Sequence, residues 1–133
     1  NHKHLKEMQA ITGLKVAPIF CPIVSDFYSG MMVTVPLFAS QLKNNATVAD
    51  IKALYKGKYT SDIVKYQESL DDNGFISAAK LKDSDAMTVT VAGNEDRILL
   101  VAVYNNLGKG ASGAAIECMN VVLGQPKNSV LDI

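Results

Sequence analysis

Two histidines stand at the start of this sequence, separated by one lysine, and they are the only imidazoles in its 133 residues. His2 and His4 have the side chain that transfers protons near neutral pH, and their alternate spacing puts both on one side of an extended segment. Two such imidazoles can also bind a metal ion, but a catalytic zinc usually takes three protein ligands and no third candidate stands out. The pair therefore predicts either acid–base chemistry or two plain terminal residues, and no metal site.

A glycine-rich stretch near the other end, Gly108-Lys-Gly-Ala-Ser-Gly113, matches the G-x-G-x-x-G pattern of dinucleotide-binding proteins. That pattern also needs a second parallel strand after the helix, and only nine residues follow Gly124. We therefore reject the dinucleotide fingerprint. The stretch predicts a helix start whose backbone N–H groups and Lys109 can meet a phosphate or carboxamide group, or simply a helix start loosened by glycine.

Two further patterns with possible chemistry give weaker signals. Asp71-Asp-Asn-Gly74 looks like the middle of a calcium-binding loop, but the twelfth position of that loop would be Lys80, where calcium needs a carboxylate. A plain turn is the prediction. Cys21 and Cys118 are the only cysteines, too few for a disulfide framework or a four-thiolate zinc site, so we expect two reduced thiols in the core.

Composition predicts one domain over residues 1–133, because the chain is long enough for one core but not for two. Thirteen basic and thirteen acidic residues cancel, which argues against nucleic acid or an anionic membrane as partner. No apolar run approaches the ~18 residues that span a bilayer, and no signal peptide is visible. We expect a soluble, cytoplasmic protein that binds a small molecule or another protein.

Periodicity and punctuation predict the elements that position these residues. Apolar residues at spacings of three and four indicate helices, and alternating or continuous runs of Val, Ile, Met and Phe indicate strands. A capping pair, Thr47 with Asp50, marks the start of one helix. The predicted helices are 4–12, 47–57 and 111–123, and the predicted strands are 16–24, 30–38, 63–67, 87–93 and 97–104, of which the last two form a hairpin. This order is α+β, with helices on one face of a mixed or mainly antiparallel sheet.

Four stretches in this order resemble one enzyme family over nearly the whole chain. His2-Lys-His-Leu-Lys-Glu-Met8 looks like the family's His-Arg-His-x-x-Glu-Ile segment, and Phe20-Cys-Pro and Gly30-Met-Met-Val-Thr34 look like its Phe-x-Pro and Gly-x-x-x-Thr strands. Asn106-Leu-Gly-Lys-Gly-Ala-Ser-Gly113 is similar to its Asn-Leu-x-Lys-Gly-Ala-x-Gly stretch, which continues to Met-Asn-x-x-Leu-Gly, as does Met119-Asn-Val-Val-Leu-Gly124. The sequence thus resembles N-acetyl-gamma-glutamyl-phosphate reductase.

The resemblance implies a fold like the second domain of glyceraldehyde-3-phosphate and aspartate-semialdehyde dehydrogenases. That domain has a sheet with helices on one face and a subunit contact on the other, so we expect a homo-oligomer formed through the sheet face. The resemblance also implies an NADP-binding domain upstream of Asn1, to which residues 106–124 return. We therefore expect this chain to be a truncated half that is inactive by itself.

The resemblance further implies a reaction. In this family a cysteine thiolate displaces phosphate from N-acetyl-gamma-glutamyl phosphate, and NADPH reduces the thioester to N-acetylglutamate semialdehyde in arginine biosynthesis. By motif position the acid–base role falls on His2 or His4, and we favour His2. The family's nucleophile belongs to the upstream domain, so Cys21 and Cys118 are expected to be structural.

The same motifs imply binding residues. Contacts to NADP fall on Asn106, Lys109 and Gly110 at the helix start. The family carries Arg before the glycine that matches Gly30, whereas this chain has Ser29 there, so a bidentate grip on substrate is lost at that position. Lys3 and Tyr28 then become the expected substrate-binding residues, with Lys109 or the upstream domain as further sources of charge.

A function of another class competes with the reductase. The departure at Ser29 and the abrupt start also suit a free-standing binding or regulatory module that shares the fold without catalysis. What precedes Asn1 separates the two, because a nucleotide-binding domain with a Gly-Cys nucleophile segment belongs only to the reductase. A histidine-based metal enzyme is the weakest alternative.

Overall fold

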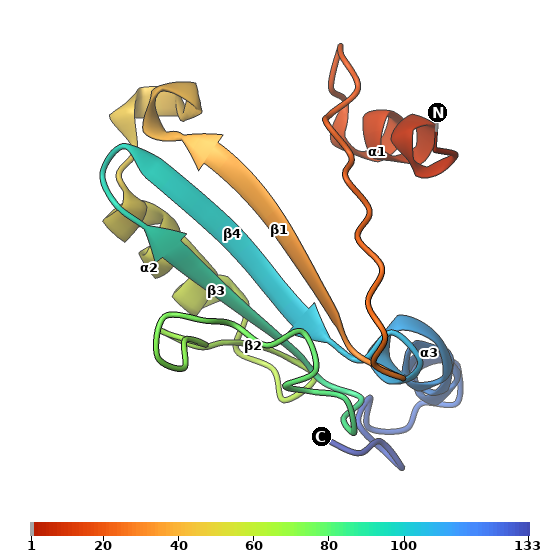
Figure 1. The fold of residues 1–133 in the computed structure, drawn as a ribbon. Coiled ribbons are helices and arrows are strands. Elements are labelled where there is room, and N and C mark those ends of the chain that lie inside the picture. The colour runs from red at the N-terminus through yellow and green to blue at the C-terminus, as the bar shows by residue number, and fades with distance from the viewer. Residues whose placement is uncertain (1) are drawn as a thin grey trace.

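The computed structural model describes residues 2–133, in which four strands form one mixed sheet in the order β1-β4-β3-β2 (Figure 1). The strands are β1 (Met31–Phe38), β2 (Val64–Tyr66), β3 (Met87–Gly93) and β4 (Arg97–Tyr104). β4 is antiparallel to both β1 and β3, whereas β2 runs parallel to β3. The α+β class and the mixed sheet are therefore confirmed.

The β3–β4 hairpin is formed where the sequence predicted it. Its turn depends on Gly93, whose φ of 118° suits glycine, and on Asn94, whose side-chain oxygen accepts the backbone N–H groups of Asp96 and Arg97. The valines and threonines of β3 are buried on both sides. β3 is thus a central strand, covered on both faces.

The two faces of the sheet are covered by different parts of the chain. On one face, Val101 and Val103 of β4 pack with Leu70 and with residues of the loop between β2 and β3. The other face carries Val89, and Tyr66 lies beside Val89 in the register. The Tyr66 hydroxyl donates to Glu68, and Glu68 forms an ion pair with Lys52 of α2 (Val48–Lys58). The helix α2 therefore lies on the Val89 face, behind the strands in Figure 1.

The start of α2 follows the predicted capping pair. The Thr47 hydroxyl accepts the N–H of Asp50, and the Asp50 carboxylate accepts the N–H and hydroxyl of Thr47. These hydrogen bonds hold the pKa of Asp50 below its usual value. Two short 3₁₀ turns, Ala39–Gln41 and Lys43–Asn45, connect β1 to this helix.

The prediction of a strand over 16–24 was wrong. Residues 13–30 contain no strand, and the chain there is an extended trace that connects α1 (His4–Thr12) to the sheet (Figure 1). Pro18 and Pro22 have no N–H to donate, so an apolar run interrupted by them cannot pair along its length. We call residues 2–28 the N-terminal arm. Its helix ends as predicted at Gly13, in the left-handed conformation with φ of 71°.

The last helix begins differently from the prediction. Residues Gly108–Ser112 form a π-helical turn, and α3 (Gly113–Val122) continues from it to Gly124, whose φ is 67°. Asn120 faces inward and donates to the carbonyls of Lys127 and Ser129, whereas the predicted apolar stripe, including Met119 and Leu123, is exposed. No helix within residues 2–133 is long and apolar enough to cross a membrane.

Candidate functional site

The two histidines meet a phenylalanine at the start of α1. The ring centroids of His2 and His4 are 4.6 Å apart, and the Phe20 ring lies 4.7 Å from His2 and 6.2 Å from His4. The backbone N–H of His4 donates to Nδ1 of His2 at 3.3 Å. Because Nδ1 accepts, a neutral His2 carries its proton on Nε2, which can then donate to an oxygen atom of a ligand.

His4 is held differently, although both imidazoles are exposed. Its Nε2 lies 3.9 Å from a carboxylate oxygen of Glu7, one helical turn away. Nε2 of His4 therefore lies beside a carboxylate, whereas the structure gives Nε2 of His2 no ion-pair partner among the described residues. The two rings therefore differ in how readily their Nε2 atoms can contact a ligand.

The end of β4 leads into the second predicted group. The side-chain oxygen of Asn106 accepts the backbone N–H of Gly30 at 2.8 Å, and Gly110 donates its N–H to the carbonyl of Asn105. With its oxygen occupied, the Asn106 side chain has its amide N–H groups left to donate. Asn106 can therefore bind a carbonyl oxygen of a ligand without losing its own structural contact.

The glycines of the Gly108–Gly113 stretch have a structural explanation. A Cβ atom at Gly108 would lie 2.6 Å from Oδ1 of Asp85, and a Cβ at Gly113 would contact the same oxygen still more closely. A Cβ at Gly110 would lie 3.3 Å from the Tyr104 ring. The spacing that imitates a dinucleotide fingerprint thus lets the helix start pack against Asp85 and Tyr104, and α3 is the last element of the described chain.

Charge at this helix start is neutralised internally. Lys109 Nζ contacts a carboxylate oxygen of Glu117 at 2.5 Å, and both side chains are largely shielded from solvent. Tyr104 donates its hydroxyl to Met31 Sδ, and burial raises the pKa of Tyr104 above its ordinary value. Lys109 therefore acts first as an intrahelical ion-pair partner in this structure.

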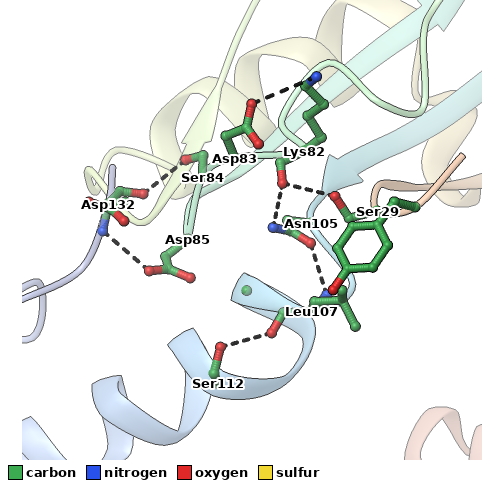
Figure 2. Close-up of a pocket in the computed structure, with 11 residues that line it drawn as sticks. Ser29, Lys82, Asp83, Ser84, Asp85, Asn105, Leu107, Ser112 and Asp132 are labelled. Atoms are coloured by element: carbon green, nitrogen blue, oxygen red, sulfur yellow. Dashed lines mark hydrogen bonds and ion pairs between the residues drawn. The ribbon is translucent and has the colours of Figure 1, made fainter.

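A pocket of about 490 Å³ lies where the arm, the β2–β3 loop and the helix start meet (Figure 2). Most of its polar groups bind one another: Ser29 and Asn105 both donate to the carbonyl of Lys82. Tyr28 is on the lining of the pocket but is 91% exposed. The lining residues are Tyr28, Ser29, Lys82, Asp83, Ser84, Asp85, Asn105, Leu107, Gly108, Ser112 and Asp132.

Comparison with known proteins identifies the architecture. Residues 1–106 match the family described as the semialdehyde dehydrogenase dimerisation domain. The chain belongs to this family. It is also 42% identical over 130 residues to the N-acetyl-gamma-glutamyl-phosphate reductase of Brucella suis, covering 93% of this chain and 42% of that protein. The protein of the same name from Brucella ovis is 41% identical. The chain thus spans less than half the length of these curated relatives.

The sequence-predicted residues form two separate groups in the structure. His2, Lys3 and His4 lie on or beside α1, whereas Asn106, Lys109 and Gly110 lie at the start of α3, and Figure 1 places these helices far apart. Tyr28 lies with the second group. Among residues 2–133, no group of three His, Cys, Asp or Glu side chains is placed to hold a metal ion.

The expectation that both cysteines are core thiols was wrong, because Cys21 and Cys118 are exposed and unpaired with each other. Cys21 lies in the N-terminal arm, where little packs against it, and Cys118 lies on the exposed side of α3. The sequence predicted burial of both thiols because apolar residues flank each cysteine. Several of those neighbours, such as Ile23 and Met119, are themselves exposed.

Two residues of the dimerisation domain's site were missed by sequence reasoning. Phe20 was noted only as part of a motif, and its contact with the histidines depends on how the arm folds back on α1. Asp85 lies in an ordinary polar loop, Ser84-Asp-Ala86, with no motif around it. The glycine spacing of the helix start was the only signal that a side chain must approach there, and it does not say which one.

Proposed function

We propose that this chain is the catalytic and dimerisation part of an NADP-dependent N-acetyl-gamma-glutamyl-phosphate reductase. The observation that carries the proposal is the identity of 42% to a protein of that name over 93% of this chain. The position of His2 supports it, because the family match over residues 1–106 includes the segment in which an acid–base residue is expected. The rest of the reductase, including the thiolate nucleophile, lies in the part of the relatives that this chain does not match.

His2 is the acid–base residue in this proposal. When the carbonyl carbon of the substrate becomes tetrahedral, its oxygen gains negative charge, and a donor at that oxygen lowers the barrier. Nε2 of a neutral His2 carries the proton, since Nδ1 accepts from the His4 backbone at 3.3 Å. His2 therefore donates to the carbonyl oxygen, while His4, beside Glu7, stays a secondary contact.

The cofactor contacts are proposed at the start of α3. When bound, NADPH supplies the hydride that reduces the thioester. Asn106 fits such a group best, because its amide N–H groups remain free to donate while its oxygen holds Gly30. Gly110 allows close backbone approach, and Lys109 adds positive charge only to the extent that Glu117 does not neutralise it.

Substrate contacts are proposed for Lys3 and Tyr28. Lys3 is exposed between the two histidines at the first residue before α1, so its ammonium group can meet a carboxylate or phosphate near His2. Tyr28 is exposed beside the pocket of Figure 2, and its hydroxyl can donate to the same kind of oxygen. Of these two residues, Tyr28 stands directly before Ser29, where the family's arginine is missing, whereas Lys3 lies apart from it at the start of α1.

The proposal also includes assembly and location. A homo-oligomer formed through the sheet fits the description of the family as a dimerisation domain and the exposure of β1. The cytoplasm suits the two exposed thiols, which persist unpaired in a reducing compartment. Phosphate and a small acyl substrate are the expected ligands, with no nucleic acid and no membrane.

The test is an assay of the full-length protein that contains this chain. N-acetylglutamate semialdehyde should reduce NADP only when phosphate is present, and this 133-residue chain alone should not support the reaction. His2→Ala should lower kcat by roughly 10²- to 10⁴-fold, as expected for loss of an acid–base residue, whereas His4→Ala should change it far less. Phosphate-independent or absent turnover would contradict the function, and the reverse order of the two variants would move the role to His4.

A further inference from the structure

Most large apolar side chains of the N-terminal arm are exposed, whereas Phe20, like Leu5 and Met8, is only partly exposed. Ile19 is 100% exposed, and Ile23 and Val24 are nearly so. Phe20 is only partly exposed, and its ring lies against His2. The residues on either side of Phe20 do not pack with it, because Ile19 and Cys21 are both exposed.

The contact between Phe20 and His2 restrains the imidazole from one side. The two rings are tilted by 54° with centroids 4.7 Å apart, an arrangement typical of favourable aromatic pairs. The His4 ring lies on His2 as well, at 4.6 Å, and the His4 N–H fixes Nδ1. His2 is thus held by two rings and one hydrogen bond although it is exposed, which leaves Nε2 as its unrestrained end.

We propose that Phe20 is a positioning residue, which holds the His2 imidazole in the orientation from which Nε2 donates to the substrate. This inference rests on the proposed reductase function. An imidazole near the end of an exposed arm would otherwise rotate about χ1 and χ2, and each misorientation lowers the fraction of molecules ready to react. Phe20 touches no reacting atom and acts through His2.

The N-terminal arm folds back on itself, and this brings the Phe20 ring to His2. Fifteen residues of chain separate Phe20 from His4, and they include the rest of α1 and the turn at Gly13. The helix α1 reverses the chain direction relative to the extended trace, so that residue 20 returns to residue 2. The arm therefore folds back around the imidazoles before the chain enters β1 at Met31.

The test compares Phe20→Leu, Phe20→Tyr and Ile19→Ala in the full-length protein. Leucine keeps the apolar volume without the ring, tyrosine restores the ring, and Ile19 is the matched control on the exposed side. Phe20→Leu should lower kcat by about tenfold with KM for the semialdehyde changed by less than about twofold, because orientation and not binding is lost. Phe20→Tyr should recover kcat, and Ile19→Ala should resemble the unsubstituted protein.

A second measurement does not depend on turnover. Proton–carbon NMR of ¹³C-labelled histidine, with His2 assigned by its absence in His2→Gln, reports the ring current of Phe20 on the His2 imidazole. The His2 signal should move in Phe20→Leu, return in Phe20→Tyr and stay in place in Ile19→Ala. Thermal unfolding of each variant establishes that the protein remains folded.

The outcomes separate the two proposals. If the enzyme is active and Phe20→Leu changes neither kcat nor the His2 signal, positioning by Phe20 is overturned while the reductase function stands. If the protein has no reductase activity but the His2 signal responds to Phe20→Leu, the function fails and the contact that positions His2 is supported. A loss of kcat in Phe20→Leu that Phe20→Tyr does not recover also overturns a role for the ring.

Discussion

The side-chain oxygen of Asn106 accepts the backbone N–H of Gly30 at 2.8 Å, and this bond joins two motifs that are 76 residues apart. Gly30 has φ of 125°, and a Cβ there would lie 2.6 Å from the carbonyl oxygen of Ala78. Only glycine suits both restrictions. The base of the N-terminal arm and the proposed cofactor contact are therefore fixed at the same point of the fold.

Substitution of Asn106 should separate its structural role from its proposed cofactor role. Asn106→Ala removes the acceptor and leaves the N–H of Gly30 without its partner, which should lower the free energy of unfolding by roughly 1–3 kcal/mol. Asn106→Asp keeps the acceptor but loses the amide donor, so it should retain most of the stability and raise KM for NADPH. Thermal unfolding and steady-state kinetics measure the two effects.

Each of these two variants can contradict one of the two roles of Asn106. Equal stability of Asn106→Ala and the unsubstituted protein would contradict the importance of the Gly30 bond. An unchanged KM for NADPH in Asn106→Asp would remove Asn106 from the cofactor site while leaving its structural contact intact.

Gly113→Ala should destabilise the chain because the new methyl group would collide with the Asp85 carboxylate. Overpacking of this kind costs about 1–3 kcal/mol. Gly57→Ala in α2 is the matched control, since a Cβ there meets nothing within 4 Å and alanine suits a helix better, by roughly 0.5–1 kcal/mol. Urea unfolding of both variants should give changes of opposite sign.

A second substitution identifies the cause. Asp85→Ala removes the carboxylate, so the cost of Gly113→Ala should shrink in that background. An equal cost with and without Asp85 would mean that glycine is required at residue 113 for another reason.

Most of the sheet and helices could be predicted from the sequence because their signals are local. Alternating Val and Thr in β3, the Thr47–Asp50 capping pair and the left-handed glycines at residues 13 and 124 each act over a few residues. The strand predicted over 16–24 failed because apolar composition alone does not provide a pairing partner. Most of the apolar side chains between residues 14 and 28 are exposed, and nothing local in the sequence reveals that.

The candidate site could be predicted only in its parts. His2, His4 and Asn106 were found by residue type and by motif, and their roles still await the tests above. The contacts that hold these residues come from elsewhere in the chain. The Phe20 ring packs against His2, and Gly30 donates to Asn106 beside the paired ends of β1 and β4. Such contacts depend on the tertiary fold, so residue spacing does not encode them in a readable way.

Acid should weaken the fold partly through the capping pair at α2. The pKa of Asp50 is lowered from 3.8 by its hydrogen bonds to Thr47. Its contribution to stability is therefore present above the unfolded value of 3.8 and is lost as the pH falls below it towards the folded pKa. Asp50→Asn removes this titration, so its stability should decline less between about pH 5 and pH 3.

The measurement is the unfolding midpoint as a function of pH for Asp50→Asn and for Asp71→Asn. Asp71→Asn is the matched control for the loss of one carboxylate, because Asp71 is exposed and its carboxylate accepts no side-chain or backbone hydrogen bond among residues 2–133. Parallel pH profiles for Asp50→Asn and the unsubstituted protein would contradict the linkage.

Leu99→Glu should weaken the proposed self-association through the sheet. Leu99 is paired with Pro36 in the register and lies on the Val101 face, opposite α2, where it is 40% exposed. A glutamate there would have to be desolvated on contact with a second copy, which costs far more than exposure to water. We expect the dimer dissociation constant to rise at least about tenfold, or about 1.4 kcal/mol. Sedimentation velocity of the full-length protein over a range of concentrations measures this change.

Leu54→Glu is the matched control for Leu99→Glu. Leu54 is also an exposed leucine, but it lies on α2 and therefore on the other side of the sheet. If subunits pair through the Val101 face, only the Leu99 variant should dissociate, because only its charge enters the interface. Dissociation of the Leu54 variant alone would place the contact on the helical face instead. Dimers that withstand both substitutions would exclude both faces of the sheet as the subunit contact. The exposed edge of β1 would then be the remaining contact, because strands pair there through backbone groups that neither glutamate alters.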